Sequence, residues 1–300
     1  MTCACLRSGW LLMVGVVTAA AAQAGCASFT APPISVSYDP LGAQGSAQIV
    51  QPITLTAASD SGSPTAVMGQ FVDQNSGSLR IGTGGPLYTI MRSYNRVVVP
   101  LGVTFNPSFA FDYDFMSVGT RKAEMIPGVN FYIDPGQDVA AGVYRENFDL
   151  QYQCSSSTAT ETQSGVLQIV VNVPSTLTAS LAGGSTAGTL DFGDFSSLTR
   201  TAMVGVYSTG PYAISFSSAN ARAMKLQNPP PGAVNSSNAQ IPYVVSFAGA
   251  ALSGGTTHFP RTGVGGTSLP LTVTVDPALD KRAGVYHDVI TVTFTPLTAL

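Results

Sequence analysis

Apolar and polar residues alternate with a period of two along many short stretches of this chain. Two clear examples are LTVTV at residues 271–275 and VITVTF at residues 289–294, and both are rich in β-branched residues. Clusters of Gly, Pro, Ser and Asn separate such stretches, and no convincing helical periodicity extends beyond two turns. The pattern predicts an all-β protein built from short strands.

The chain also contains an internal repeat. The sequence IDPGQDVAAGVY at residues 133–144 matches VDPALDKRAGVY at residues 275–286, an offset of 142 positions from Asp134 to Asp276. The same offset aligns VPLGVTF at residues 99–105 with IPYVVSF at residues 241–247. Two copies are too few for a solenoid, so the repeat indicates two tandem domains of one fold, at residues 25–173 and 174–300.

The spacing of strands and turns predicts two immunoglobulin-like antiparallel β-sandwiches. In the first copy, the strand that runs to Cys154 is followed by a second apolar run, VLQIVVNV at residues 166–173. In the second copy, the equivalent strand ends near Phe294 and the sequence ends at Leu300. We therefore expect the second sandwich to lack its final strand and to accept a strand from another subunit.

The first residues have the features of a secretory signal. Residues 10–22 are apolar, and Ala22-Gln23-Ala24 fits the small-x-small cleavage rule, which predicts a signal peptide at residues 1–24. The alternative is a lipoprotein site at Cys26, although Gln23 stands where such sites usually have Leu. No later apolar run is long enough for a transmembrane helix, so we expect export through the periplasm to the cell surface.

Charge and cysteine content agree with export. Charged residues make up 10% of the chain and the net charge is −3, without a basic patch, which argues against a nucleic acid partner. Cys3 and Cys5 leave with the signal, whereas Cys26 and Cys154 remain. In an oxidising compartment these two form a disulfide, and the alternative is a pair of unrelated buried thiols.

Four stretches of the second domain carry a family likeness. They are VPSTLTASL at 173–181, LDFG at 190–193, YAISFSSAN at 212–220 and AGVYHDVITVTFTP at 283–296. Together they resemble the spore coat protein U domain, which forms the subunits of archaic chaperone–usher pili such as Csu pili. The first domain is more distant and keeps VSYDP at 36–40 and AGVY at 141–144.

The two-domain arrangement is similar to the tip adhesin of such pili. The ordinary pilins of the family are single domains whose N-terminal extension completes a neighbour's sandwich, and we expect no room for such an extension before Cys26. The resemblance implies three partners: a periplasmic chaperone, an outer-membrane usher and a neighbouring pilin that donates a strand.

Side chains suited to catalysis are few, and we expect no enzyme, cofactor or metal site. His258 and His287 lie in different contexts and have no metal-ligand spacing. Asp112 and Asp114 form a D-x-D pair without the other ligands of a calcium loop. The run GTGG at residues 82–85 lacks the Lys-Ser/Thr of a phosphate loop, so it predicts a plain turn.

Two apolar stretches of the first domain have two interpretations each. Phe109, Phe111, Tyr113 and Phe115 alternate and are followed by Met116, and PLYTIM occupies residues 86–91. Such strands commonly pack into a core, but exposed apolar patches mark interaction sites. The candidate surface-binding residues are Leu87, Tyr88, Ile90, Met91, Phe115 and Met116.

The expected function is attachment of cells to an abiotic or host surface, as in biofilm formation. Two alternatives stay open. One is a structural spore-coat-like or pilus shaft protein without an adhesive role, and the other is a secreted carbohydrate-binding module or hydrolase.

Overall fold

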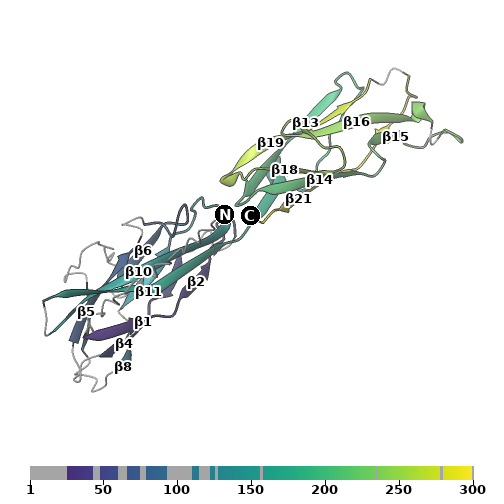
Figure 1. Cartoon of the computed structure of the whole chain (residues 1–300). Helices are drawn as coiled ribbons and strands as arrows, with labels where there is room; N and C mark the ends of the chain where they lie inside the picture. Colours follow the sequence, from purple (N-terminus) through teal and green to yellow (C-terminus); the bar gives the residue numbers. More distant parts are fainter. Residues whose placement is uncertain are drawn as a thin grey trace, which may run out of the picture.

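The computed structural model describes residues 26–42, 48–59, 66–74, 79–92, 110–114, 122–125, 128–155, 158–233, 236–277 and 280–298. The predicted signal peptide, residues 1–24, lies outside these ranges. Within them the strands form two groups, each with its own hydrophobic core, and the two bodies are joined end to end (Figure 1). The all-β prediction is therefore confirmed. We call the two bodies the first sandwich, up to Val173, and the second sandwich, from Leu177.

Three sheets form the first sandwich. The largest has the order β2-β11-β10-β5-β7, and the two smaller ones have the orders β1-β4-β8 and β3-β9-β6. The strands are β1 Ala27–Thr30, β2 Ile34–Ser37, β3 Ile49–Pro52, β4 Leu55–Ser59, β5 Ala66–Asp73, β6 Tyr88–Arg92, β7 Phe111–Asp114, β8 Lys122–Met125, β9 Val129–Ile133, β10 Gly142–Cys154 and β11 Thr160–Val173.

Strand β11 completes the first sandwich. It pairs antiparallel with β10 along almost its whole length, and its other edge pairs in parallel with β2. Its side chains Leu167, Ile169 and Val171 are at most 1% exposed, because they fill the core between the sheets. The predicted apolar run at residues 166–173 is thus the last strand of this sandwich.

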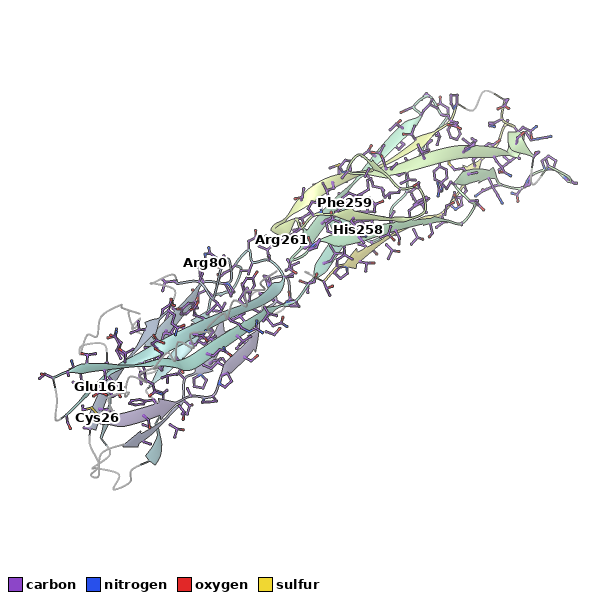
Figure 2. All side chains as sticks on the ribbon, in the orientation of Figure 1. Cys26, Arg80, Glu161, His258, Phe259 and Arg261 are labelled. Atoms are coloured by element: carbon purple, nitrogen blue, oxygen red, sulfur yellow. A yellow bond between two sulfur atoms is a disulfide. The ribbon has the colours of Figure 1, made fainter. Side chains whose placement is uncertain are left out.

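The predicted disulfide is present between Cys26 and Cys154. It joins the residue before β1 to the last residue of β10, across 128 positions of sequence. Cys26 lies at the end of the molecule away from the second sandwich (Figure 2). The bond therefore ties the start of the first-sandwich chain to the end of β10 at that far end.

Two sheets form the second sandwich. One has the order β12-β13-β19-β16-β15-β20, with β17 paired to β16, and the other has the order β18-β14-β21. The strands are β12 Leu177–Leu181, β13 Thr199–Ser208, β14 Tyr212–Ser218, β15 Ala223–Leu226, β16 Gln240–Phe247, β17 Ala250–Ala251, β18 Thr256–Phe259, β19 Gly263–Val275, β20 Tyr286–His287 and β21 Ile290–Pro296.

The pairing pattern follows the sequence repeat. Strands β7, β5 and β10 of the first sandwich correspond to β18, β14 and β21 of the second, and they pair in the same order. Beyond β10 the first sandwich continues with β11 and β2, whereas β21 is an edge strand within the described residues. The described helices are short 3-10 turns, η3 Ala182–Gly184 and η4 Ser237–Ala239, and none has the length and apolar character needed to cross a bilayer.

Candidate functional site

The clearest difference between the two sandwiches is the burial of equivalent side chains on β10 and β21. At the repeat offset, Phe148 corresponds to Ile290 and Tyr152 to Phe294. Phe148 is 0% exposed and Tyr152 is 4% exposed, because β11 lies beside them. Ile290 and Phe294 are only half-buried. Among the described residues, no strand covers these core-facing side chains of the second sandwich as β11 covers those of the first.

An open groove of about 660 Å³ lies along these residues. One side is formed by β12, through Ala179 and Leu181, and the other by β21, through Ile290, Val292 and Phe294. The floor comes from β13 and β19 and includes Val204, Leu271 and Val273. The lining is mostly apolar, and strand-forming residues border the groove on two sides, so its shape and chemistry suit an extended apolar segment.

Backbone groups along the groove are available for strand pairing. Strand β21 pairs with β14, and β12 pairs with β13, so each has its second edge facing away from its own sheet. In the part of the chain that the structure describes, no strand pairs with either of these outer edges. An open edge beside an apolar groove is the arrangement that binds an added strand by β-augmentation.

A polar cluster lies at the groove near β20. The Asp288 carboxylate accepts hydrogen bonds from the Tyr243 hydroxyl, from Ser218 Oγ at 2.6 Å and from the Asn220 N–H at 3.1 Å. Burial, followed by the bond to Asp288, raises the pKa of Tyr243. The Asp288 carboxylate is thereby bound by groups of its own domain, and the residue lies between β20 and β21 in the lining of the groove.

The structure corrects part of the predicted surface-binding set. Tyr88 is 2% exposed and Ile90 is 1% exposed, because β6 pairs with β9 and turns both side chains into the core. The expectation that they are exposed is wrong. Leu87 is 45% exposed and Met91 is half-buried. Leu87 is held by Gln137, whose side chain bonds both the N–H and the carbonyl of Leu87.

The other two candidates, Phe115 and Met116, lie outside the described residues. They directly follow Asp114, the last residue of β7, which lies opposite Ala66 at the start of β5. The neighbouring pair is Val67 and Cys154, so β7 ends on the side of the disulfide. Asp114 therefore lies on the side of the first sandwich that carries Cys26, which Figure 2 places at the end away from the second sandwich.

Sequence analysis missed a buried acidic pair in the first sandwich. Asp73 and Glu146 are 4% and 3% exposed, and the carboxyl group of Glu146 is hydrogen-bonded to Asp73. Asp73 also accepts from the Tyr88 hydroxyl at 3.1 Å, and Glu146 accepts from the Gly82 N–H at 3.0 Å. Burial, together with the charge of Asp73, raises the pKa of Glu146. Residue type alone gave no signal for this pair, since the partners are far apart in sequence.

The structure does not bring the two histidines together. His258 lies on β18 and His287 on β20, strands of different sheets, and both side chains are exposed. Asp112 and Asp114 both lie on β7, whose side chains are not described. Among the described residues, no three His, Cys, Asp or Glu side chains cluster closely enough to hold a metal ion.

Comparisons with known proteins found no matching family model and no matching curated protein. Solved structures do match. One is the CsuC–CsuE chaperone–tip adhesion subunit pre-assembly complex of the archaic chaperone–usher Csu pili of Acinetobacter baumannii, at 17% identity and a TM-score of 0.41, covering 90% of this chain and 99% of that one.

Two further matches are adhesins. CfaE, the adhesive subunit of CFA/I fimbria of enterotoxigenic Escherichia coli, shares 15% identity at a TM-score of 0.40, covering 91% of this chain and 82% of that one. The CupB6 tip adhesin from Pseudomonas aeruginosa shares 13% identity at a TM-score of 0.37, covering 90% and 92%. TM-scores of 0.37 to 0.41 are too low to support a function for this chain, so the groove is the basis of the function proposed below.

Proposed function

We propose that this chain is the tip subunit of an archaic chaperone–usher pilus and attaches cells to a surface. The observation that carries the proposal is the contrast between a first sandwich completed by its own β11 and a second sandwich with an open groove beside β21. A subunit of this kind can receive a strand from a neighbour through its second sandwich. Its first sandwich is filled already and is free to face outward.

The partners of the proposal follow from the groove and from the resemblance to spore coat protein U domains. An unfilled apolar groove with open strand edges aggregates unless it is covered. A periplasmic chaperone would cover it before assembly, an outer-membrane usher would receive the subunit, and the N-terminal segment of a pilin would then fill the groove. This route requires export of the chain, which the predicted signal peptide at residues 1–24 would direct.

Attachment is assigned to the far end of the first sandwich. That end carries the Cys26–Cys154 bond and the point where the chain leaves β7 toward Phe115 and Met116. Apolar side chains at the outermost end of a fibre would contact a surface without interfering with assembly. Leu87 is not part of the proposed contact, because its backbone is hydrogen-bonded to the Gln137 side chain near the second sandwich.

Immunogold labelling of isolated surface fibres with antibody to this chain tests the proposal. We expect one label at one end of each fibre, and deletion of the gene should abolish attachment. Labels along the fibre would identify a structural shaft subunit instead. Absence from fibres, combined with saturable binding or hydrolysis of a glycan, would identify a secreted carbohydrate-binding module or hydrolase.

A further inference from the structure

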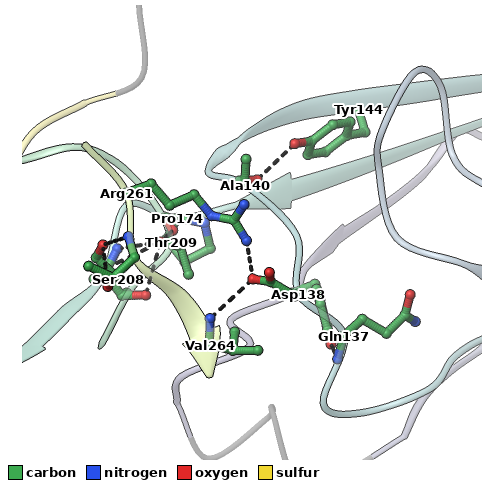
Figure 3. Close-up of polar contacts among 12 residues, drawn as sticks. Gln137, Asp138, Ala140, Tyr144, Pro174, Ser208, Thr209, Arg261 and Val264 are labelled. Carbon is green, nitrogen blue, oxygen red and sulfur yellow. Dashed lines mark hydrogen bonds and ion pairs between the residues drawn. The ribbon is translucent and has the colours of Figure 1, made fainter. Parts of the chain in front are cut away.

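The two sandwiches meet at a junction of hydrogen bonds and one ion pair (Figure 3). Asp138, in the loop before β10, pairs with the Arg261 guanidinium and accepts from the Val264 N–H at 3.1 Å. In the same loop, the Ala141 N–H donates to the carbonyl of Thr209 at 2.8 Å, and Thr209 is fully buried. The first sandwich therefore contacts the second through the loop before β10.

The repeat places a second copy of this loop before β20. Both copies are closed by the same contact, a tyrosine hydroxyl that donates to the carbonyl four residues earlier. Tyr144 donates to Ala140 at 2.8 Å, and Tyr286 donates to Arg282 at 2.8 Å. The two turns thus share the hydrogen bond that fixes their shape. The second copy lies near β15, which pairs with β20 at the end of the molecule away from the first sandwich (Figure 1).

The acidic residue of the second copy is more exposed than that of the first. Asp280 corresponds to Asp138, and its side chain is 74% exposed, compared with 55% for Asp138 beside Arg261. Asp280 forms an ion pair with the neighbouring Lys281 at 3.2 Å, and Lys281, which is 14% exposed, also donates to the carbonyl of Ser237. A carboxylate thus faces outward at the position where the first sandwich binds a cation of its neighbour.

The path of β11 indicates where a neighbouring subunit would emerge. Val173, the last residue of β11, lies opposite Gly142, the first residue of β10, and after a link of three residues the chain enters β12 of the next sandwich. At the repeat offset Gly142 corresponds to Gly284, in the loop before β20, so a strand that lies antiparallel to β21, as β11 lies along β10, would run toward that loop. The sandwich that follows it then emerges beside Asp280.

We propose that the next fibre subunit contacts the second sandwich in the same way as the second sandwich contacts the first. This subunit docks on the loop that carries Asp280 and Ala283. The partner is the β-sandwich that follows the donated strand, and it supplies a basic side chain at the position that Arg261 occupies in the second sandwich. The inference rests on the proposed strand donation. It adds a second, charged contact outside the groove.

Photocrosslinking in the intact fibre tests this inference. The photoreactive residue p-benzoylphenylalanine replaces Ala283, Val292 or Val244 in three variants of the full chain, produced in the native host with its other fibre subunits. Ala283 lies in the docking loop, Val292 in the groove wall, and Val244 on an outer face where it is 67% exposed. We expect adducts with the same neighbouring subunit from Ala283 and Val292, and none from Val244. Adding Asp280→Arg should reduce the Ala283 adduct roughly tenfold, because like charges across an interface repel.

Each other outcome contradicts a different step. An adduct from Val292 without one from Ala283 overturns the docking loop and leaves strand donation intact. An Ala283 adduct that Asp280→Arg does not change overturns the role of the charge. Adducts from neither position, in fibres that contain the chain, overturn strand donation and the docking loop together.

Discussion

Tyr152 and Phe294 occupy equivalent positions of β10 and β21, yet Tyr152 is 4% exposed whereas Phe294 is half-buried beside an open groove. The Tyr152 hydroxyl also lies within hydrogen-bond distance of two acceptors, the carbonyl oxygen of Ala27 at 2.9 Å and the carboxylate of Glu161 on β11 at 2.8 Å. The first sandwich therefore surrounds this position with its own strands, while the second leaves it open.

The disulfide is expected to stabilise the first sandwich strongly. The Cys26→Ser/Cys154→Ser variant should lose about 5 kcal/mol of unfolding free energy, because the bond closes a loop of 128 positions in the unfolded chain. Denaturant unfolding of the two proteins measures the loss, and intact-mass analysis with and without reductant verifies the bond. Equal midpoints, or two free thiols in the exported protein, would contradict the expectation.

The buried acidic pair predicts a pH-dependent stability. Because burial and Asp73 raise the pKa of Glu146, the folded chain keeps a proton that the unfolded chain releases. The stability contributed by this group is present below the unfolded pKa and is lost as pH rises through the folded pKa. Glu146→Gln cannot ionise, so it should have a higher Tm than the parent at pH 8 and the difference should shrink toward pH 4.

Thermal unfolding of the parent and Glu146→Gln across that pH range provides the measurement. Asp149→Asn is the matched control, since Asp149 lies on the same strand and its carboxylate is bound by exposed groups, Gln74 and the Gly165 N–H. A Tm difference for Glu146→Gln that stays constant with pH would rule out the titration.

Attachment is expected to depend on the far end of the first sandwich. Phe115→Ser and Met116→Ser together should reduce surface attachment several-fold while fibre number stays normal, because two apolar side chains of the proposed contact are lost. Leu87→Ser is the matched control, since Leu87 is 45% exposed but tied to Gln137 near the junction. Attachment is counted per fibre. Equal loss in the control, or unfolding of the double variant, would refute the assignment.

Much of the fold could be predicted because the repeat and the strand periodicity are local properties of the sequence. The alternation at residues 289–294 predicted β21, and the apolar run at residues 166–173 predicted β11. The cysteine count predicted the bridge between Cys26 and Cys154. The difference of one strand between the copies followed from aligning them, and it is the basis of the groove.

The individual side-chain contacts could not be predicted from the sequence. Tyr88 and Ile90 alternate with Leu87, Thr89 and Met91, and only the pairing of β6 with β9 shows which face enters the core. The pairing of Asp138 with Arg261 joins residues of different sandwiches, so neither the repeat nor periodicity predicts it. Such contacts depend on how distant segments are brought together.

The central claim is that the second sandwich is completed by an added strand, and a fusion of the full chain tests it most directly. The sequence of β11, residues 160–173, is appended after Leu300 through a flexible linker, and the control carries the same segment with Ser at the positions of Leu167, Ile169 and Val171. Filling the groove should stabilise the second sandwich by at least about 3 kcal/mol, since three half-buried side chains each gain about 1 kcal/mol on full burial. Calorimetry should therefore show a higher unfolding temperature for the apolar fusion than for its Ser control. Identical unfolding of the two fusions would contradict the open groove and, with it, the proposed place of this chain in a fibre.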